Sequence, residues 1–211
     1  MINKINSNKN ATYLKTILID YWIEKYKPEL IINEFPFLKG DRRADLVFIQ
    51  NNNLVGLEIK SELDSLKNLN IQIDNYIKVF DFVYILIDKK FLKSKEIKLL
   101  NKNVGIIIYN NNLIIKRHAK NIKKFHKEDL ISLLWRKDLD KLSNKKYIYL
   151  EDLKKEICRN YKIQEIKQQT TIALKERYGI TFNSFLRDRG NFTTIDDLQT
   201  ITRIKKEHLL F

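Results

Sequence analysis

Two short apolar runs, joined by three asparagines, form the clearest hydrophobic pattern of this chain. The runs cover residues 43–50 and 54–61 and are rich in the β-branched, aromatic and other apolar residues of buried strands. Asparagine tolerates the left-handed backbone of a tight hairpin turn, and residues 51–53 are all asparagine. We therefore predict an antiparallel hairpin.

Charged side chains interrupt this apolar pattern at three positions. Asp45 lies on the first run, and Glu58 and Lys60 lie on the second. Because side chains alternate across a strand, Glu58 and Lys60 leave the same face. In a tight hairpin, Asp45 lies opposite Glu58 or diagonally next to it on that face. Two carboxylates and an ammonium group are thus predicted to converge.

This convergence has a chemical interpretation. Buried carboxylates repel each other unless a cation lies between them, and hard oxygen ligands favour Mg²⁺, with Mn²⁺ as an alternative. Lys60 would lie beside the metal-bound water or the scissile phosphate and stabilise developing negative charge. The alternative is a solvated sheet face on which Lys60 simply pairs with Glu58 or Glu62.

The same residues resemble the D…(D/E)xK signature of the PD-(D/E)xK nucleases, the restriction-endonuclease-like superfamily. Asp45 is followed, after twelve residues, by Glu58, Ile59 and Lys60. Ala44 stands where the nominal motif has proline, which many members of the superfamily lack.

A second match lies downstream. Gln72 and Tyr76 fit the QxxxY element of the RecB-like exonuclease branch, and they would share a face if residues 69–80 are helical. The resemblance covers roughly residues 10–120. It is closest to small, poorly characterised bacterial proteins with a GDxRADL-like strand and an EIKSxxD-like strand, here residues 40–46 and 58–64. Tyr76 as an ordinary core aromatic remains an alternative.

The resemblance implies an α/β (α+β) fold with a mixed central β-sheet flanked by helices, Mg²⁺ dependence and cleavage of nucleic acid, most simply DNA. It implies that Asp45, Glu58 and the Ile59 carbonyl hold the metal and that Lys60 positions or deprotonates the attacking water. Gln72 and Tyr76 would orient the substrate. Glu34, in the apolar run 30–36, is a further candidate catalytic acid or an edge-strand glutamate.

Further along the chain, strand-like patterns give way to helical ones. Residues 82–87 predict a core strand and residues 104–116 a second hairpin, which completes a nuclease-like core over residues 1–125. Residues 126–211 predict a helical subdomain, with apolar stripes at 130–139 and 150–161. A helix over 163–178 should end at Gly179, and Thr194 should begin another. The helices either pack on the core or form a helix-turn-helix that presents Lys167 and Lys175 to a nucleic-acid groove.

The charge of the chain favours a polyanionic partner. Its 211 residues carry a formal net charge of +14, of which +3 falls on residues 1–100 and +11 on residues 101–211. Arg42 and Arg43 flank the acidic motif, although one of them could only neutralise an acid. The densest basic cluster is a candidate phosphate-binding surface or a solvated linker. It consists of Lys116, Arg117, Lys120, Lys123, Lys124 and Lys127.

The composition also indicates the cellular compartment. A single cysteine, Cys158, suits a reducing compartment, residues 1–9 lack an apolar signal core, and no apolar run is long enough to span a bilayer. We therefore expect a cytoplasmic, metal-dependent deoxyribonuclease without a membrane partner, acting alone, as a homodimer or in a larger defence or repair complex. The alternatives are a non-catalytic nucleic-acid-binding protein on a nuclease scaffold and an effector of RNA or DNA that a partner activates.

Overall fold

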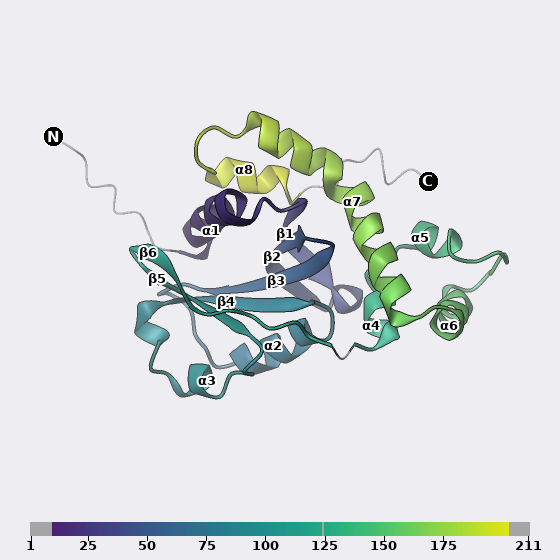
Figure 1. Cartoon of the computed structure of the whole chain (residues 1–211), viewed down its shortest axis with the longest axis horizontal. Helices are drawn as coiled ribbons and strands as arrows, with labels where there is room; N and C mark the ends of the chain where they lie inside the picture. Colours follow the sequence, from purple (N-terminus) through teal and green to yellow (C-terminus); the bar gives the residue numbers. More distant parts are fainter. Residues whose placement is uncertain (1–9, 124, 203–211) are drawn as a thin grey trace.

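A six-stranded mixed sheet forms the centre of the computed structural model, which describes residues 10–123 and 125–202 (Figure 1). The strands lie in the order β1 to β6; β4 is parallel to both β3 and β5, and the other neighbours are antiparallel. Their bounds are β1 Leu30–Phe37, β2 Arg42–Gln50, β3 Asn53–Lys60, β4 Phe82–Asp88, β5 Gly105–Asn110 and β6 Asn112–Arg117. The predicted mixed sheet and both predicted hairpins are confirmed.

The turn between β2 and β3 fixes the register on which the charged cluster depends. Asn51 and Asn52 have φ angles of 50° and 57°, the left-handed pair that a two-residue hairpin turn with the correct twist requires. Leu46 pairs with Leu57 in this hairpin. A shift of one residue would move every side chain to the other face, so the asparagine turn also decides which face the acids occupy.

Helices cover both faces of the sheet. Helix α1 and the short α8 lie on one side, and α2 and α3 lie on the other (Figure 1). The buried positions Leu14, Leu18 and Trp22 recur every four residues, which turns one face of α1 to the sheet, and the Asn10 side chain accepts from Tyr13 N–H at the helix start. The bounds on these two faces are α1 Ala11–Tyr26, α2 Leu69–Ile77, α3 Lys95–Lys98 and α8 Ile195–Thr200, with single 3₁₀ turns η1 Leu38–Gly40 and η2 Lys89–Phe91.

The helices after residue 126 form a second core and also pack on the first. Apolar side chains of α4 to α7 make a separate buried cluster, while the second half of α7 packs on β1 and α8 packs on α1. The predicted packing of the helical part on the core is thus confirmed, whereas the division into 1–125 and 126–211 stays a prediction. Their bounds are α4 Lys127–Ile131, α5 Arg136–Asp140, α6 Leu150–Asn160 and α7 Ile163–Asp188.

Three expectations for the helices were wrong. Helix α7 does not end at Gly179 but continues to Asp188, because buried Phe182 and Phe185 anchor its last turns to the main core. The stripe at 130–139 belongs to two short helices, α4 and α5. Ser61, Asp64 and Ser65 favour a helix start in the sequence. Residues 61–68 instead form turns in which Ser61 N–H and Oγ–H donate to Asp64, so α2 begins only at Leu69.

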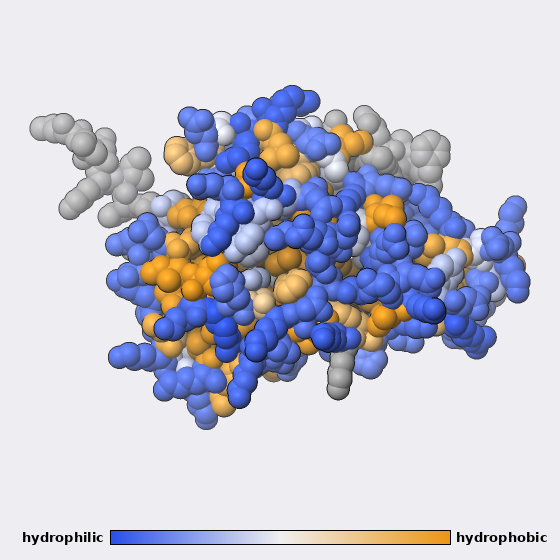
Figure 2. Space-filling view, viewed as in Figure 1, coloured by the Kyte–Doolittle hydropathy of each residue, from blue (hydrophilic) through white to orange (hydrophobic). Residues whose placement is uncertain are grey.

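None of the described helices is both long enough and apolar enough to cross a membrane. Hydrophilic residues cover most of the face in Figure 2, with a hydrophobic patch over the end of the sheet where β5 and β6 lie.

Candidate functional site

The hairpin brings Asp45, Glu58 and Lys60 together. The register Leu46 to Leu57, extended by one residue, sets Asp45 opposite Glu58. The Ile59 N–H donates to Asp45 Oδ2 at 2.8 Å, and Lys60 Nζ lies 2.7 Å from Glu58 Oε1. The Glu58 and Lys60 side chains are only 5% and 12% exposed, so this ion pair is largely shielded from water. The cluster is therefore a partly buried site rather than a solvated sheet face, while the chemical roles of its members stay predictions.

Tyr76 joins the cluster from α2. Its hydroxyl donates to Glu58 Oε2 at 2.6 Å, and the Asp45 N–H donates to the Tyr76 oxygen at 3.3 Å. Burial, followed by the charge of Glu58, raises the pKa of Tyr76 well above its ordinary value, so the hydroxyl is a neutral donor. Tyr76 also packs among core aromatics, so both interpretations of this residue describe its surroundings. Gln72 lies half-buried one turn earlier, and no contact found for the described residues joins its side chain to the carboxylates.

The crowding of negative charge in the site changes the pKa of Asp45. Burial, followed by the neighbouring charge of Glu58, raises the pKa of Asp45 from 3.8 to about 6, against the opposing effects of Lys15 and the Ile59 N–H. A carboxyl group with this pKa gains from any added positive charge beside it. The donors here are hard oxygens, which suits a divalent cation such as Mg²⁺.

Lys15, which the sequence interpretation missed, completes the site from α1. Its Nζ forms an ion pair with Glu34 and lies 3.5 Å from Asp45 Oδ1. The signal was present, because Lys15 lies within the apolar stripe that includes Leu14 and Leu18. A lysine in a buried helix face needs acidic partners.

Glu34, the additional candidate acid, occupies an unusual backbone position. Its φ is 54° within β1, and its neighbours pair as Asn33 with Leu46 and Phe35 with Ala44. This places Glu34 beside Asp45 in the register. Its second carboxylate oxygen lies 2.6 Å from Arg43 Nε, so Arg43 neutralises an acid of the site. Arg43 nevertheless remains 69% exposed, within reach of a ligand from solvent.

The densest basic cluster does not adjoin these acids. Ile122 N–H donates to the Asp81 carbonyl, just before β4, whereas Lys60 pairs with Ile87 near the other end of that strand. Six residues of strand, or about 20 Å, separate these two levels. Arg117 of β6 is level with Glu58 of β3, but β4 and β5 lie between them. Arg117 uses its guanidinium on the carbonyls of Val104 and Asn101. Three lysines of the cluster are exposed, and Lys124 lies outside the described residues; the three are Lys116, Lys120 and Lys123.

The two lysines that a helix-turn-helix would present to a nucleic-acid groove are engaged elsewhere. Lys167 forms an ion pair with Asp81, and Lys175 forms one with Glu29. Both side chains therefore tie α7 to the sheet instead of extending toward a groove.

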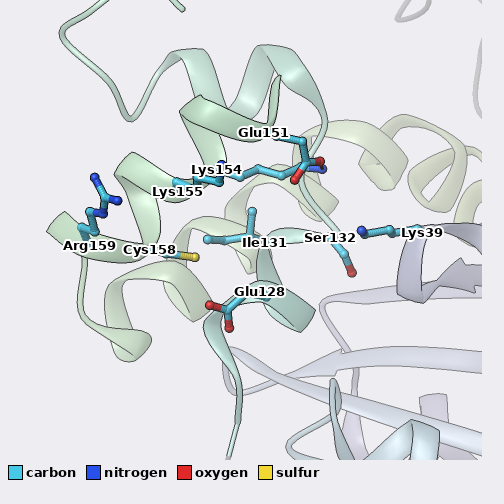
Figure 3. Close-up of a pocket in the computed structure, with 9 residues that line it drawn as sticks. All are labelled: Lys39, Glu128, Ile131, Ser132, Glu151, Lys154, Lys155, Cys158 and Arg159. Atoms are coloured by element: carbon cyan, nitrogen blue, oxygen red, sulfur yellow. Dashed lines mark hydrogen bonds and ion pairs between the residues drawn. The ribbon is translucent and has the colours of Figure 1, made fainter. Parts of the chain in front are cut away.

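Two adjoining grooves mark the surface near the site, and none of Asp45, Glu58 and Lys60 lines either of them. A groove of about 440 Å³ is lined by Arg42 and Asn75, each next in sequence to a residue of the cluster. It shares Lys39 and Ser132 with a groove of about 520 Å³ against α6. Figure 3 shows this second groove, with residues of α6 along one wall and Lys39 at the opposite end. Its α6 wall carries Glu151, Lys154, Lys155, Cys158 and Arg159.

Fold and site together define an α/β protein with an acidic and lysine-containing cluster at the β2–β3 hairpin. No group of three or more His, Cys, Asp or Glu side chains suited to a metal occurs among residues 10–123 and 125–202. The metal site that the sequence resemblance implies would instead use two carboxylates and a main-chain carbonyl.

The chain belongs to the bacteriophage P4 protein cII family, whose model matches residues 5–202. Protein cII of Enterobacteria phage P4 is 28% identical over 209 residues, which cover 92% of this chain and 78% of that protein. A solved protein of unknown function from Silicibacter pomeroyi shares 20% identity at a TM-score of 0.34, and the match covers 46% of this chain and 62% of that one, less than two thirds of its length. Neither name states an enzymatic activity.

Proposed function

We propose that this chain is a metal-dependent nuclease that hydrolyses phosphodiester bonds of DNA. The observation that carries the proposal is the meeting of Asp45, Glu58 and Lys60 at one partly buried point of the hairpin. Acids that repel each other beside a lysine, open to exposed arginines, suit the binding of a cation and a phosphate together.

The donor set fits a hard divalent cation. Asp45 and Glu58 offer carboxylate oxygens, and the Ile59 N–H points to Asp45. Since a strand residue directs its N–H and C=O to the same side, the Ile59 carbonyl also faces the Asp45 side. These three groups would hold Mg²⁺ or Mn²⁺, which supplies an acidified water and neutralises charge on the phosphoryl oxygens.

The remaining residues would act on the substrate or hold the ligands. Lys60 would turn from Glu58 toward the phosphate, where its compact ammonium group stabilises charge that develops during attack. Tyr76 would keep Glu58 oriented through its 2.6 Å hydrogen bond, as partners behind metal ligands do. Glu34 would act at a distance from the phosphate, through Lys15 and Arg43.

Basic residues close to the site would hold the flanking phosphates. Arg42 and Arg43 are exposed beside the cluster, and Lys39 and Lys78 line the adjoining groove. Guanidinium and ammonium groups at this distance fix a strand without reading its sequence. The expected binding surface thus moves from the segment 116–124 to the mouth of the groove, and Gln72 keeps only a predicted role in substrate orientation.

The test is a cleavage assay on purified wild type, Asp45→Asn and Asp74→Asn. Asp74 is an exposed carboxylate of α2 and serves as the matched control. Linear duplex, circular plasmid, single-stranded DNA and RNA would each be incubated with Mg²⁺, Mn²⁺ or chelator. We expect metal-dependent cleavage of DNA that Asp45→Asn abolishes and Asp74→Asn preserves. Equal cleavage by wild type and Asp45→Asn would refute the assignment.

A second candidate is a non-catalytic nucleic-acid-binding protein. One observation favours it: Lys15 and Lys60 already provide cations for Asp45 and Glu58. In that case the wild type would bind nucleic acid without cutting it, with an affinity that ignores chelator and falls steeply with salt. Cleavage that appears only after a partner is added would instead identify a partner-activated effector.

A further inference from the structure

Lys15 is a buried cation at the edge of the carboxylate cluster. Its side chain is 7% exposed, and its Nζ is shared between Glu34 and Asp45 Oδ1, the latter at 3.5 Å. An ammonium group removed from water stays charged only beside acids. The two carboxylates therefore stabilise the charge of Lys15, and Lys15 in turn offsets part of their negative charge.

The two oxygens of Asp45 have different partners. Oδ2 accepts from the Ile59 N–H at 2.8 Å, whereas Oδ1 faces Lys15. The oxygen of Asp45 that does not bond the backbone is thus the one beside the lysine. A divalent cation that approached this oxygen would meet the charge of Lys15 at short range, where two like charges repel strongly.

Glu34 is a second ion-pair partner for Lys15, besides Asp45. The Glu34 carboxylate contacts Lys15 with one oxygen and Arg43 with the other, and its backbone adopts a φ of 54° that non-glycine residues rarely take. The surroundings therefore hold an acid directly behind Lys15. The lysine can give up Asp45 and remain paired with Glu34.

We propose that Lys15 occupies the cation position beside Asp45 Oδ1 until a divalent metal ion displaces it toward Glu34, so that Lys15 sets the metal affinity of the site. This inference rests on the proposed function, because it takes the divalent cation as the ligand. Lys15 is a positioning residue here, since it acts on the metal through Asp45 and Glu34.

The experiment measures Mn²⁺ binding to the full chain without nucleic acid, by the electron paramagnetic resonance signal of free Mn²⁺. Lys15→Met removes the competing charge and should bind Mn²⁺ about tenfold more tightly or better. Lys15→Arg keeps the charge and should stay near the wild type. Lys25→Met, which removes an exposed lysine of the same helix, should change nothing.

Lys15→Gln provides a second neutral variant should Lys15→Met fail to fold, and thermal unfolding reports on folding in each case. Tighter binding by the neutral variants alone, including binding that the wild type lacks, supports the inference. Equal or weaker binding by the neutral variants overturns it, and metal-dependent cleavage by the wild type would then leave the proposed function intact. Absence of Mn²⁺ binding in every protein overturns both.

Discussion

Two groups of buried charges in this molecule are built on different principles. In the helical part, Arg177 of α7 and Asp138 of α5 form a closed pair, 4% and 5% exposed, with Nη2 2.6 Å from Oδ2. The Arg177 guanidinium also lies 3.8 Å from the centre of the Trp135 ring, and Asp138 accepts from the main-chain N–H of Trp135. One base meets one acid, and the hydrogen bonds around them come from the fold.

The hairpin site has the opposite character. Three acids, Glu34, Asp45 and Glu58, share the buried Lys15 and the half-buried Lys60. The third cation, Arg43, is mostly in solvent. The raised pKa of Asp45 is the electrostatic sign of this crowding. Breaking a closed pair leaves a buried charge without a partner and destabilises the fold, whereas crowded acids near the surface suit a ligand that brings positive charge.

The largest effect is expected from Glu58→Gln, which breaks the site and leaves the closed pair untouched. Loss of a carboxylate ligand should lower Mg²⁺-dependent cleavage by more than about a hundredfold, the upper range for groups that only support metal ligands. Initial rates on DNA give the measurement. Glu62→Gln, an exposed acid just past Lys60, is the control. A Glu58→Gln protein as active as the wild type would remove the basis for the proposed site.

The converse variant, Arg177→Met, breaks the closed pair and leaves the hairpin site intact. Because it strands a buried carboxylate, it should lower the free energy of unfolding by about 3–5 kcal/mol. Urea unfolding measures this, and Mn²⁺ binding under native conditions should persist. Arg187→Met, at an exposed pair with Asp188, is the control. A loss no greater than that of the control would show that the pair is not structural.

Asp45→Asn tests the crowding of the acids through the pH dependence of stability. The pKa of Asp45 is raised from 3.8 to about 6, so the folded protein holds this proton more tightly than the unfolded chain does. Ionised Asp45 therefore opposes folding fully above about pH 6, and the penalty disappears as the pH falls toward 4. The variant should be more stable than the wild type by about 1–2 kcal/mol at pH 7.5, and equal to it near pH 4. Urea unfolding at both pH values measures the difference, and a variant less stable at pH 7.5 would contradict the crowding of the acids.

The smallest effect is expected from Tyr76→Phe. The variant removes the hydrogen bond to Glu58 but keeps the ring, so the free energy of unfolding should fall by about 1 kcal/mol. Cleavage should fall about tenfold, because Glu58 keeps Lys60 as a partner but loses its orientation. Tyr149→Phe, at a residue that is 71% exposed, is the control for both measurements. Unchanged cleavage would leave Tyr76 as a core aromatic only.

Local signals predicted the hairpin and its charges. The asparagine turn and the two apolar runs fix both strands and their register, and the register alone places Asp45 opposite Glu58. These features depend on residues close together in the sequence, which explains why they could be predicted.

The parts that were missed depend on distant contacts. Lys15 meets Asp45 across thirty residues of chain, and the sequence shows only a lysine within an apolar stripe. Gly179 costs a helix about 1 kcal/mol, which the burial of Phe182 and Phe185 outweighs. The basic residues after β5 are dense in the sequence, but only the sheet shows that β4 and β5 separate Arg117 from Glu58 and that residue 122 lies near the other end of β4.

The role of the hairpin site in cleavage is best tested by comparing Lys60→Ala with Lys67→Ala on DNA, with Mg²⁺ and with chelator. Lys60 lies in the cluster, and Lys67 is an exposed lysine of the following loop. For a metal-dependent nuclease we expect cleavage by the wild type and by Lys67→Ala, and its loss in a folded Lys60→Ala protein. Cleavage that survives in Lys60→Ala, or a wild type that only binds DNA whatever the metal, would refute the proposed site.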